Sequence, residues 1–146
     1  MLANISAFFG QWHGPEGLKK QANRTRFFAE ILIDELSVLG VDVATHKYNH
    51  FDTVVINAKN SGFSSSDYVL AEFHKYGINL RKICEELVGI SFNETSSIVD
   101  LDELIEIFAD LKEKTNSSGF LSEQFYEDKK YKGLPLNLKR TSEFMT

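Results

Sequence analysis

Residues 76–111 constrain the fold of this chain more than any other stretch, because three local signals in it agree. Residues 78–83 and 87–92 are rich in apolar and β-branched side chains, and Glu85 and Glu86 separate them. This pattern predicts two strands joined by a tight turn. Asp100 then stands three residues before Glu103, which is the spacing of a capping box at the start of a helix. The apolar residues that follow fall on one helical face: Leu101, Leu104, Ile105, Phe108 and Leu111.

The first forty residues predict two helices separated by a break. Residues 1–13 are apolar and aromatic with helical spacing, but no capping residue precedes them, so we expect this helix to have begun upstream. Gly14 and Pro15 interrupt the pattern, because proline is tolerated only in the first turn of a helix. A long amphipathic helix over residues 15–39 should follow, and Gly40 can end it in a left-handed conformation.

The remaining segments complete a mixed fold. Residues 41–58 predict one strand, because the centre of this segment is β-branched and its flanks hold Asn and Gly. A loop over residues 60–66 leads into a helix that stops at Gly77. Beyond residue 115 the periodic pattern is lost. The sequence therefore predicts an α+β fold with a three-stranded, mostly antiparallel sheet and helices on one face.

Length and charge exclude several classes of protein. A chain of 146 residues is long enough for one domain with its own core. The formal net charge of −5 argues against a nucleic-acid partner, whose phosphates it would repel. The single cysteine, Cys84, cannot form an internal disulfide and suits a reducing compartment. No apolar run reaches the roughly 18 residues that a membrane-spanning helix requires, so we expect no membrane partner.

Three blocks of sequence carry a resemblance to a known family. They read LANISAFFGQWHGPEGL from Leu2, GINLR followed by VGISFNET and DLDEL from Gly77, and LKRTSEFMT from Leu138. Their order and spacing resemble the glycine-cleavage P-proteins, glycine dehydrogenases (decarboxylating), over essentially the whole chain. Two positions depart from the family pattern: Asn93 replaces the usual aspartate, and Glu143 replaces a frequent proline.

The resemblance implies a place for this chain within a longer protein. It corresponds to the small C-terminal domain of the first P-protein half, which is similar to the small domain of fold-type-I pyridoxal phosphate enzymes. Residues 1–40 would be connector helices from a large domain, residues 41–115 the small domain, and residues 116–146 an irregular tail leading to the second half. In this interpretation the segment is structural, and both of its ends are cut.

The resemblance also implies an activity for the full-length protein. It would decarboxylate glycine on pyridoxal phosphate and transfer the aminomethyl group to the lipoyl arm of H-protein, and it would be a homodimer. Its location would be the mitochondrial matrix in a eukaryote or the cytoplasm in a bacterium. The family's cofactor lysine follows a histidine in the second half. Here the His-Lys pairs at 46–47 and 74–75 lack the Gly-rich surroundings of that lysine. We therefore expect no catalytic or cofactor-binding residue, no bound cofactor and no activity in this chain alone.

Other candidate sites have simpler structural explanations. The four histidines do not pair at i, i+4 and are joined by no second cysteine, so a metal site is not expected. Adjacent Glu85 and Glu86 fit a solvated turn, and the acids at 100, 102 and 103 fit a helix N-terminus. The glycines at 14, 17 and 40 follow no strand and do not form a phosphate loop. The aromatic residues Phe8, Phe9 and Trp12 fit core or interdomain packing better than ligand stacking.

Arg81 is the one residue with a specific alternative role. Strand alternation places Ile78, Leu80 and Lys82 on one face and Asn79, Arg81 and Ile83 on the other. Small domains of fold-type-I enzymes commonly provide an arginine for the substrate carboxylate, whereas a sheet arginine more often pairs with a neighbouring acid. We do not assign it as a site. A second class of function also remains open, namely a stand-alone α+β binding or interaction module.

Overall fold

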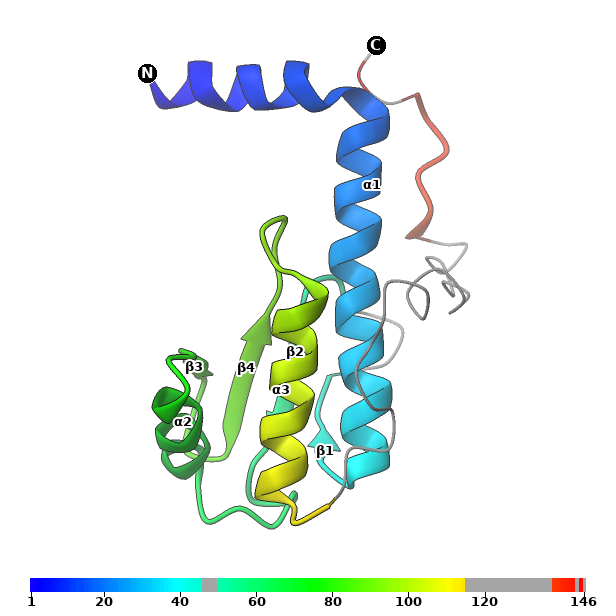
Figure 1. Ribbon diagram of the computed structural model, residues 1–146. Coiled ribbons are helices and arrows are strands. Elements are labelled where there is room, and N and C mark those ends of the chain that lie inside the picture. Colours follow the sequence, from blue (N-terminus) through cyan, green and yellow to red (C-terminus); the bar gives the residue numbers. More distant parts are fainter. Residues whose placement is uncertain (46–49, 115–137, 144, 146) are drawn as a thin grey trace.

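The computed structural model describes residues 1–45, 50–114, 138–143 and Met145, and these residues form three helices and four strands (Figure 1). The helices are α1 (Leu2–Leu39), α2 (Ser66–Lys75) and α3 (Ile98–Leu111). The strands are β1 (Asp42–Val43), β2 (Thr53–Asn57), β3 (Arg81–Lys82) and β4 (Leu87–Ser91). The α+β class predicted from the sequence is confirmed. The predicted tail over residues 116–146 lies largely outside the described residues.

The sheet has four antiparallel strands in the order β1-β2-β4-β3, so the prediction of three strands is wrong. Residues 41–58 form two strands that pair with each other, with Val43 opposite Ile56. The backbone N–H groups of Ala44 and Thr45 both donate to the carbonyl oxygen of Val55. This local pairing satisfies backbone groups along the edge of β2 and covers an edge that would otherwise be open.

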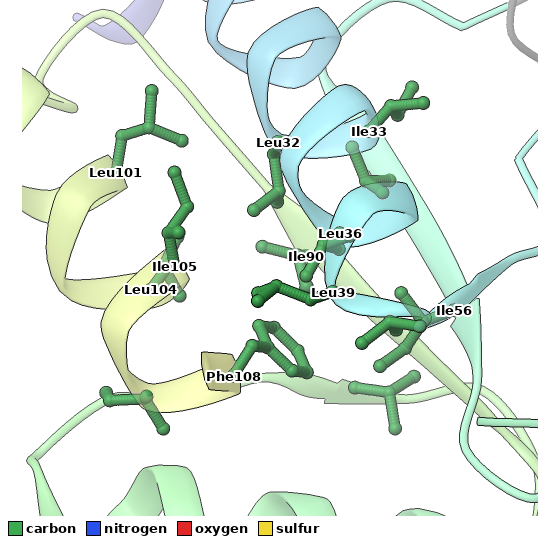
Figure 2. Packing of buried hydrophobic residues seen from close by; sticks show 14 of the residues in the cluster. Leu32, Ile33, Leu36, Leu39, Ile56, Ile90, Leu101, Leu104, Ile105 and Phe108 are labelled. Carbon is green, nitrogen blue, oxygen red and sulfur yellow. The ribbon is translucent and has the colours of Figure 1, made fainter. Parts of the chain in front are cut away.

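One face of the sheet carries the core. Val54 and Ile56 of β2 lie opposite Ile90 and Val88 of β4, and all four side chains are buried. Figure 2 shows Ile56 and Ile90 on the side of the sheet where Leu36 and Phe108 also lie. All three helices contribute buried apolar residues to this cluster, which confirms that the helices cover one face. The buried apolar residues that the helices contribute include Phe28, Leu32, Leu36, Val69, Phe73, Leu101, Ile105 and Phe108.

The hairpin of β3 and β4 is confirmed, but its first strand is shorter than predicted. Only Arg81 and Lys82 pair with β4, and the N–H groups of Ile83 and Cys84 donate to the carbonyl oxygen of Leu87 at the turn. Ile78 and Leu80 pack against the core outside the ladder of hydrogen bonds. Apolar alternation in 78–83 therefore reflects burial rather than a full strand.

Helix α1 is sharply bent at Gly14, as the Gly14–Pro15 break predicts (Figure 1). Gly14 has φ 61° and ψ −179°, a conformation that is essentially restricted to glycine. The second predicted cap is also confirmed, because Gly40 ends the helix with φ 74° and its N–H donates to the carbonyl oxygens of Leu36 and Ser37. The bend divides α1 into an N-terminal arm, residues 2–13, and a long segment that packs on the sheet.

Replacing Gly14 with alanine should disturb the bend without a steric clash, because a Cβ at this position meets no atom within 4 Å. The unfavourable backbone conformation costs about 1–3 kcal/mol for a residue with a side chain. We expect the arm to change direction, which electron paramagnetic resonance distances between spin labels at residues 8 and 99 would detect. Gly10→Ala, in regular helix, is the matched control and should leave these distances unchanged.

Helix α3 begins one turn earlier than predicted. Ser97 is the N-cap and its Oγ accepts from the N–H of Asp100, while the Asp100 carboxylate accepts from the N–H of Ser97. Asp100 is thus the last residue of a capping box, at helix position N3, and not its first, so the predicted pairing with Glu103 is wrong. The earlier start places Ile98 against the core, which a helix starting at Asp100 would not do.

Ser97→Ala should lower the free energy of unfolding by about 1 kcal/mol, because the mutation removes the side-chain acceptor of the cap. Glu103→Gln should change it by less than about 0.5 kcal/mol, since Glu103 is exposed and does not belong to the capping box. Urea unfolding followed by circular dichroism compares the two variants. If Glu103→Gln lowered the stability more than Ser97→Ala, the capping box would instead run from Asp100 to Glu103, as the sequence predicts.

Candidate functional site

The N-terminal arm presents an apolar surface that stays largely exposed among the described residues. Leu2 is 78%, Phe8 66% and Trp12 86% exposed, and Ile5 and Phe9 are exposed as well. Residues 1–15 contain no Asp, Glu, Lys or Arg. The aromatic stripe therefore does not pack in the core formed by the described residues, and the other predicted alternative, interdomain packing, stays a prediction. A continuous exposed surface of this kind is typical of a site that contacts another surface.

A groove of about 550 Å³ lies between the arm and the body of the protein. We call it the elbow groove. It is lined by apolar and polar side chains of the arm, of the long segment of α1 and of the segments at the ends of β2 and β4. The lining residues are Ile5, Ser6, Phe9, Leu18, Gln21, Ala22, Thr25, Phe51, Asp52, Phe92, Asn93 and Glu94.

Contacts across the bend hold the arm in place beside this groove. Gln21 Nε2 lies 3.1 Å from His13 Nδ1, which joins the two parts of α1. Within the arm itself, the ring centroids of Phe9 and His13 lie 4.4 Å apart. Gly17 leaves room for this arrangement, because a Cβ there would lie 3.1 Å from the Cβ of His13. The chain itself therefore determines the direction of the arm.

The three histidines of the described residues are not brought together. His13 lies at the bend, His50 is buried before β2, and His74 is exposed in the last turn of α2. His46 lies outside the described residues. Within the described ranges, no group of three His, Cys, Asp or Glu side chains could hold a metal ion. Cys84 is exposed in the hairpin turn.

The lysines that follow histidine have no environment for Schiff-base chemistry in the described part of the chain. Lys75 is 64% exposed and its Nζ lies 2.6 Å from the carboxylate of Glu72. The hydrogen bond to Glu72 raises the pKa of Lys75, whereas a nucleophilic lysine requires a lowered pKa. Lys75 lines neither the elbow groove nor the pocket beside Arg81. Lys47 lies outside the described residues.

Arg81 lies on the face of the sheet opposite the core, as strand alternation predicts. It pairs with Gly89 across β3 and β4, and a small pocket of about 320 Å³ lies beside it. Lys82 points to the other face and binds Asp67 at 2.6 Å. No carboxylate in the described part of the chain forms an ion pair with Arg81, so the predicted pairing with a neighbouring acid is not observed there.

The acidic candidates occupy structural positions. Glu85 and Glu86 are exposed in the hairpin turn, and Glu86 lies 3.4 Å from Lys59. Asp100 caps α3, and Asp102 is buried on the same helix. These four acids do not converge on a shared pocket, because Asp100 lines one of the two described pockets and the other three line neither.

Sequence reasoning missed a buried ion pair on α1. Arg26 Nη2 lies 3.1 Å from Glu30 Oε1, and their side chains are 3% and 13% exposed. Arg26 Nη1 also donates to the carbonyl oxygen of His50, which ties α1 to the segment before β2. The spacing i, i+4 was visible in the sequence, but nothing there showed that the pair is buried.

Comparison with known proteins decides the family. The model of the glycine cleavage system P-protein family matches residues 1–108. The chain belongs to the P-protein family. It is 34% identical over 151 residues to glycine dehydrogenase (decarboxylating) of Psychromonas ingrahamii, covering 100% of this chain and 15% of the relative. It is 34% identical over 146 residues to the protein of the same name from Photobacterium profundum, covering 100% of this chain and 14% of the relative.

The P-protein assignment confirms the resemblance of the three sequence blocks. The chain spans about one seventh of the length of these two relatives, with 15% and 14% covered. The match extends across the arm, the bend and the sheet, so the exposed apolar arm belongs to the P-protein sequence itself. Among the described residues, no helix combines the length and apolar character needed to cross a bilayer.

Proposed function

We propose that this chain is a structural segment of a glycine dehydrogenase (decarboxylating). The full enzyme would decarboxylate glycine on pyridoxal phosphate and transfer the aminomethyl group to the lipoyl arm of H-protein. The family match and the names of the relatives support this activity. The observation that carries the structural role is the uncovered apolar arm, which needs a partner surface.

The proposed organisation follows the bend and the sheet. Residues 1–40 connect to a large domain, residues 41–115 form the small domain, and residues 116–146 lead toward the second half of the protein. The helix-covered antiparallel sheet supports the proposed likeness to small domains of fold-type-I pyridoxal phosphate enzymes. The bend at Gly14 lies inside the proposed connector, where it sets the angle between the arm and the small domain.

We assign the cofactor chemistry to the rest of the protein. Pyridoxal phosphate is held by a lysine and acts as an electron sink. The described residues do not fit this role, because Lys75 is exposed and paired with Glu72 outside both pockets. We therefore derive no reaction step on this chain and assign no catalytic residue to it.

The proposed partners are the remainder of the P-protein and the lipoyl domain of H-protein, within a homodimer of the full-length enzyme. The compared relatives are bacterial, which supports a cytoplasmic location. For a eukaryotic source the corresponding location would be the mitochondrial matrix.

Complementation tests the proposal. The Photobacterium profundum relative is produced without the segment that matches this chain and is mixed with the chain, pyridoxal phosphate, H-protein and glycine. We expect the two proteins to co-elute in gel filtration and to release the glycine carboxyl group as CO2. A chain that stays a separate, stable monomer and restores no CO2 release would favour the stand-alone binding module instead.

A further inference from the structure

We propose that the elbow groove binds a segment with an apolar anchor next to a lysine or arginine, contributed by the P-protein outside this chain. The inference rests on the proposed function and specifies its contact. It concerns the groove between the arm and the ends of β2 and β4, and not the exposed arm as a whole.

The groove is preformed, which favours binding of an ordered segment. Gly14 fixes the bend, and the contact of His13 with Gln21 spans it. On the opposite wall, the N–H of Phe92 donates to the carbonyl oxygen of Asp52, which joins the ends of β2 and β4. A binding surface that is already ordered loses less conformational entropy when a partner binds.

The apolar part of the groove specifies the anchor. Ile5 projects from the arm and is 55% exposed, while Phe51 faces the groove from the body and is 50% exposed. Leu18 and Ala22 also line the groove. Apolar walls on both sides of a groove favour an aliphatic or aromatic side chain between them.

The charged residues of the groove indicate which type of residue should stand next to the apolar anchor in the bound segment. Asp52 and Glu94 are the charged residues of the lining, and both are acidic. The Arg24 side chain is already engaged close to Glu94, because it donates to the carbonyl oxygen of Ser96 and lies over the ring of Phe28. The turn that carries Glu94 is ordered by the Asn93 side chain, which accepts from the N–H groups of Thr95 and Ser96. A basic residue in the bound segment therefore meets acidic lining residues of complementary charge.

Overlapping peptides from the rest of the Psychromonas ingrahamii relative test this proposal. Each peptide is titrated into the full chain, and binding is followed by fluorescence anisotropy at two salt concentrations. We expect the peptides that bind to contain an apolar residue beside Lys or Arg. Ile5→Ser and Phe51→Ser should each weaken this binding by more than about tenfold. Both side chains are exposed, so the fold should be retained.

Charge and position controls complete the experiment. Asp52→Asn combined with Glu94→Gln should weaken binding by about threefold and reduce its dependence on salt. Val99→Ser alters an exposed apolar residue of α3 outside the groove and should have no effect.

Four outcomes would overturn the inference. The first two are peptide binding that stays unchanged in all groove variants and a preference for acidic peptides. The other two are binding of the chain only to lipid vesicles or to itself, and absence of binding by every peptide. Complementation by the chain is measured independently, so restored CO2 release combined with any of these outcomes would reject the groove contact and retain the proposed function.

Discussion

Replacing Phe108 with alanine is expected to lower the free energy of unfolding by about 3–5 kcal/mol, because the variant loses buried apolar surface and leaves a cavity. Phe108 is 0% exposed and lies in α3, where its ring centroid is 4.7 Å from that of Phe73 in α2. The side chain lies among the buried residues of α1 and the sheet (Figure 2). No other element can fill the space without moving away from its own partners.

Chemical denaturation of Phe108→Ala and of a control variant, Val99→Ala, checks this expectation. Val99→Ala is the matched control on the same helix, since Val99 is 69% exposed, and its effect should stay within about 0.5 kcal/mol. If Phe108→Ala cost no more than the control, then α2 and α3 would not share one core. The packing of helices on one face of the sheet would then need revision.

Replacing Arg26 with methionine should cost about 3–5 kcal/mol, because it leaves a carboxylate in a poorly solvated site without its partner. Glu30, the partner at 3.1 Å, is only 13% exposed. The variant also loses the hydrogen bond from Arg26 to the carbonyl oxygen of His50, which joins α1 to the segment before β2. A surface ion pair with the same i, i+4 spacing would contribute far less.

The double variant Arg26→Met, Glu30→Gln separates the charge from the packing. Removing both charges should restore a large part of the stability lost in the single variant, since no unpaired carboxylate remains. A double-mutant cycle measured by urea unfolding gives the coupling between the two side chains. Equal stability of Arg26→Met and the original chain would show that the pair is solvated and contributes little.

The local elements of the fold could be predicted because their signals lie close together in the sequence. Gly14 and Pro15 marked the bend of α1, and Gly40 marked its end. Apolar spacing identified the buried face of α3. Its start was misplaced because Ser97 and Asp100 are both capping residues, and the sequence alone did not show that Ile98 packs on the core.

Features that depend on long-range contacts could not be predicted from local sequence signals. The pairing of β1 with β2 is decided by hydrogen bonds to Val55, and a run of β-branched residues reads equally well as one strand. The elbow groove combines residues from positions 5 to 94, which no local pattern connects. The exposure of Trp12 was also hidden, since an aromatic helical stripe is the same in a core and at an interface.

The most direct test of a structural role without cofactor chemistry is a titration of the full chain with pyridoxal phosphate. Absorbance is followed during the titration, and borohydride reduction with mass spectrometry then locates any lysine that has bound the cofactor. We expect no saturable band and no single modified lysine, because the described lysine that follows a histidine, Lys75, is exposed and paired with Glu72. A saturable band with one lysine modified at one cofactor per chain would contradict this and would give the chain a cofactor site of its own.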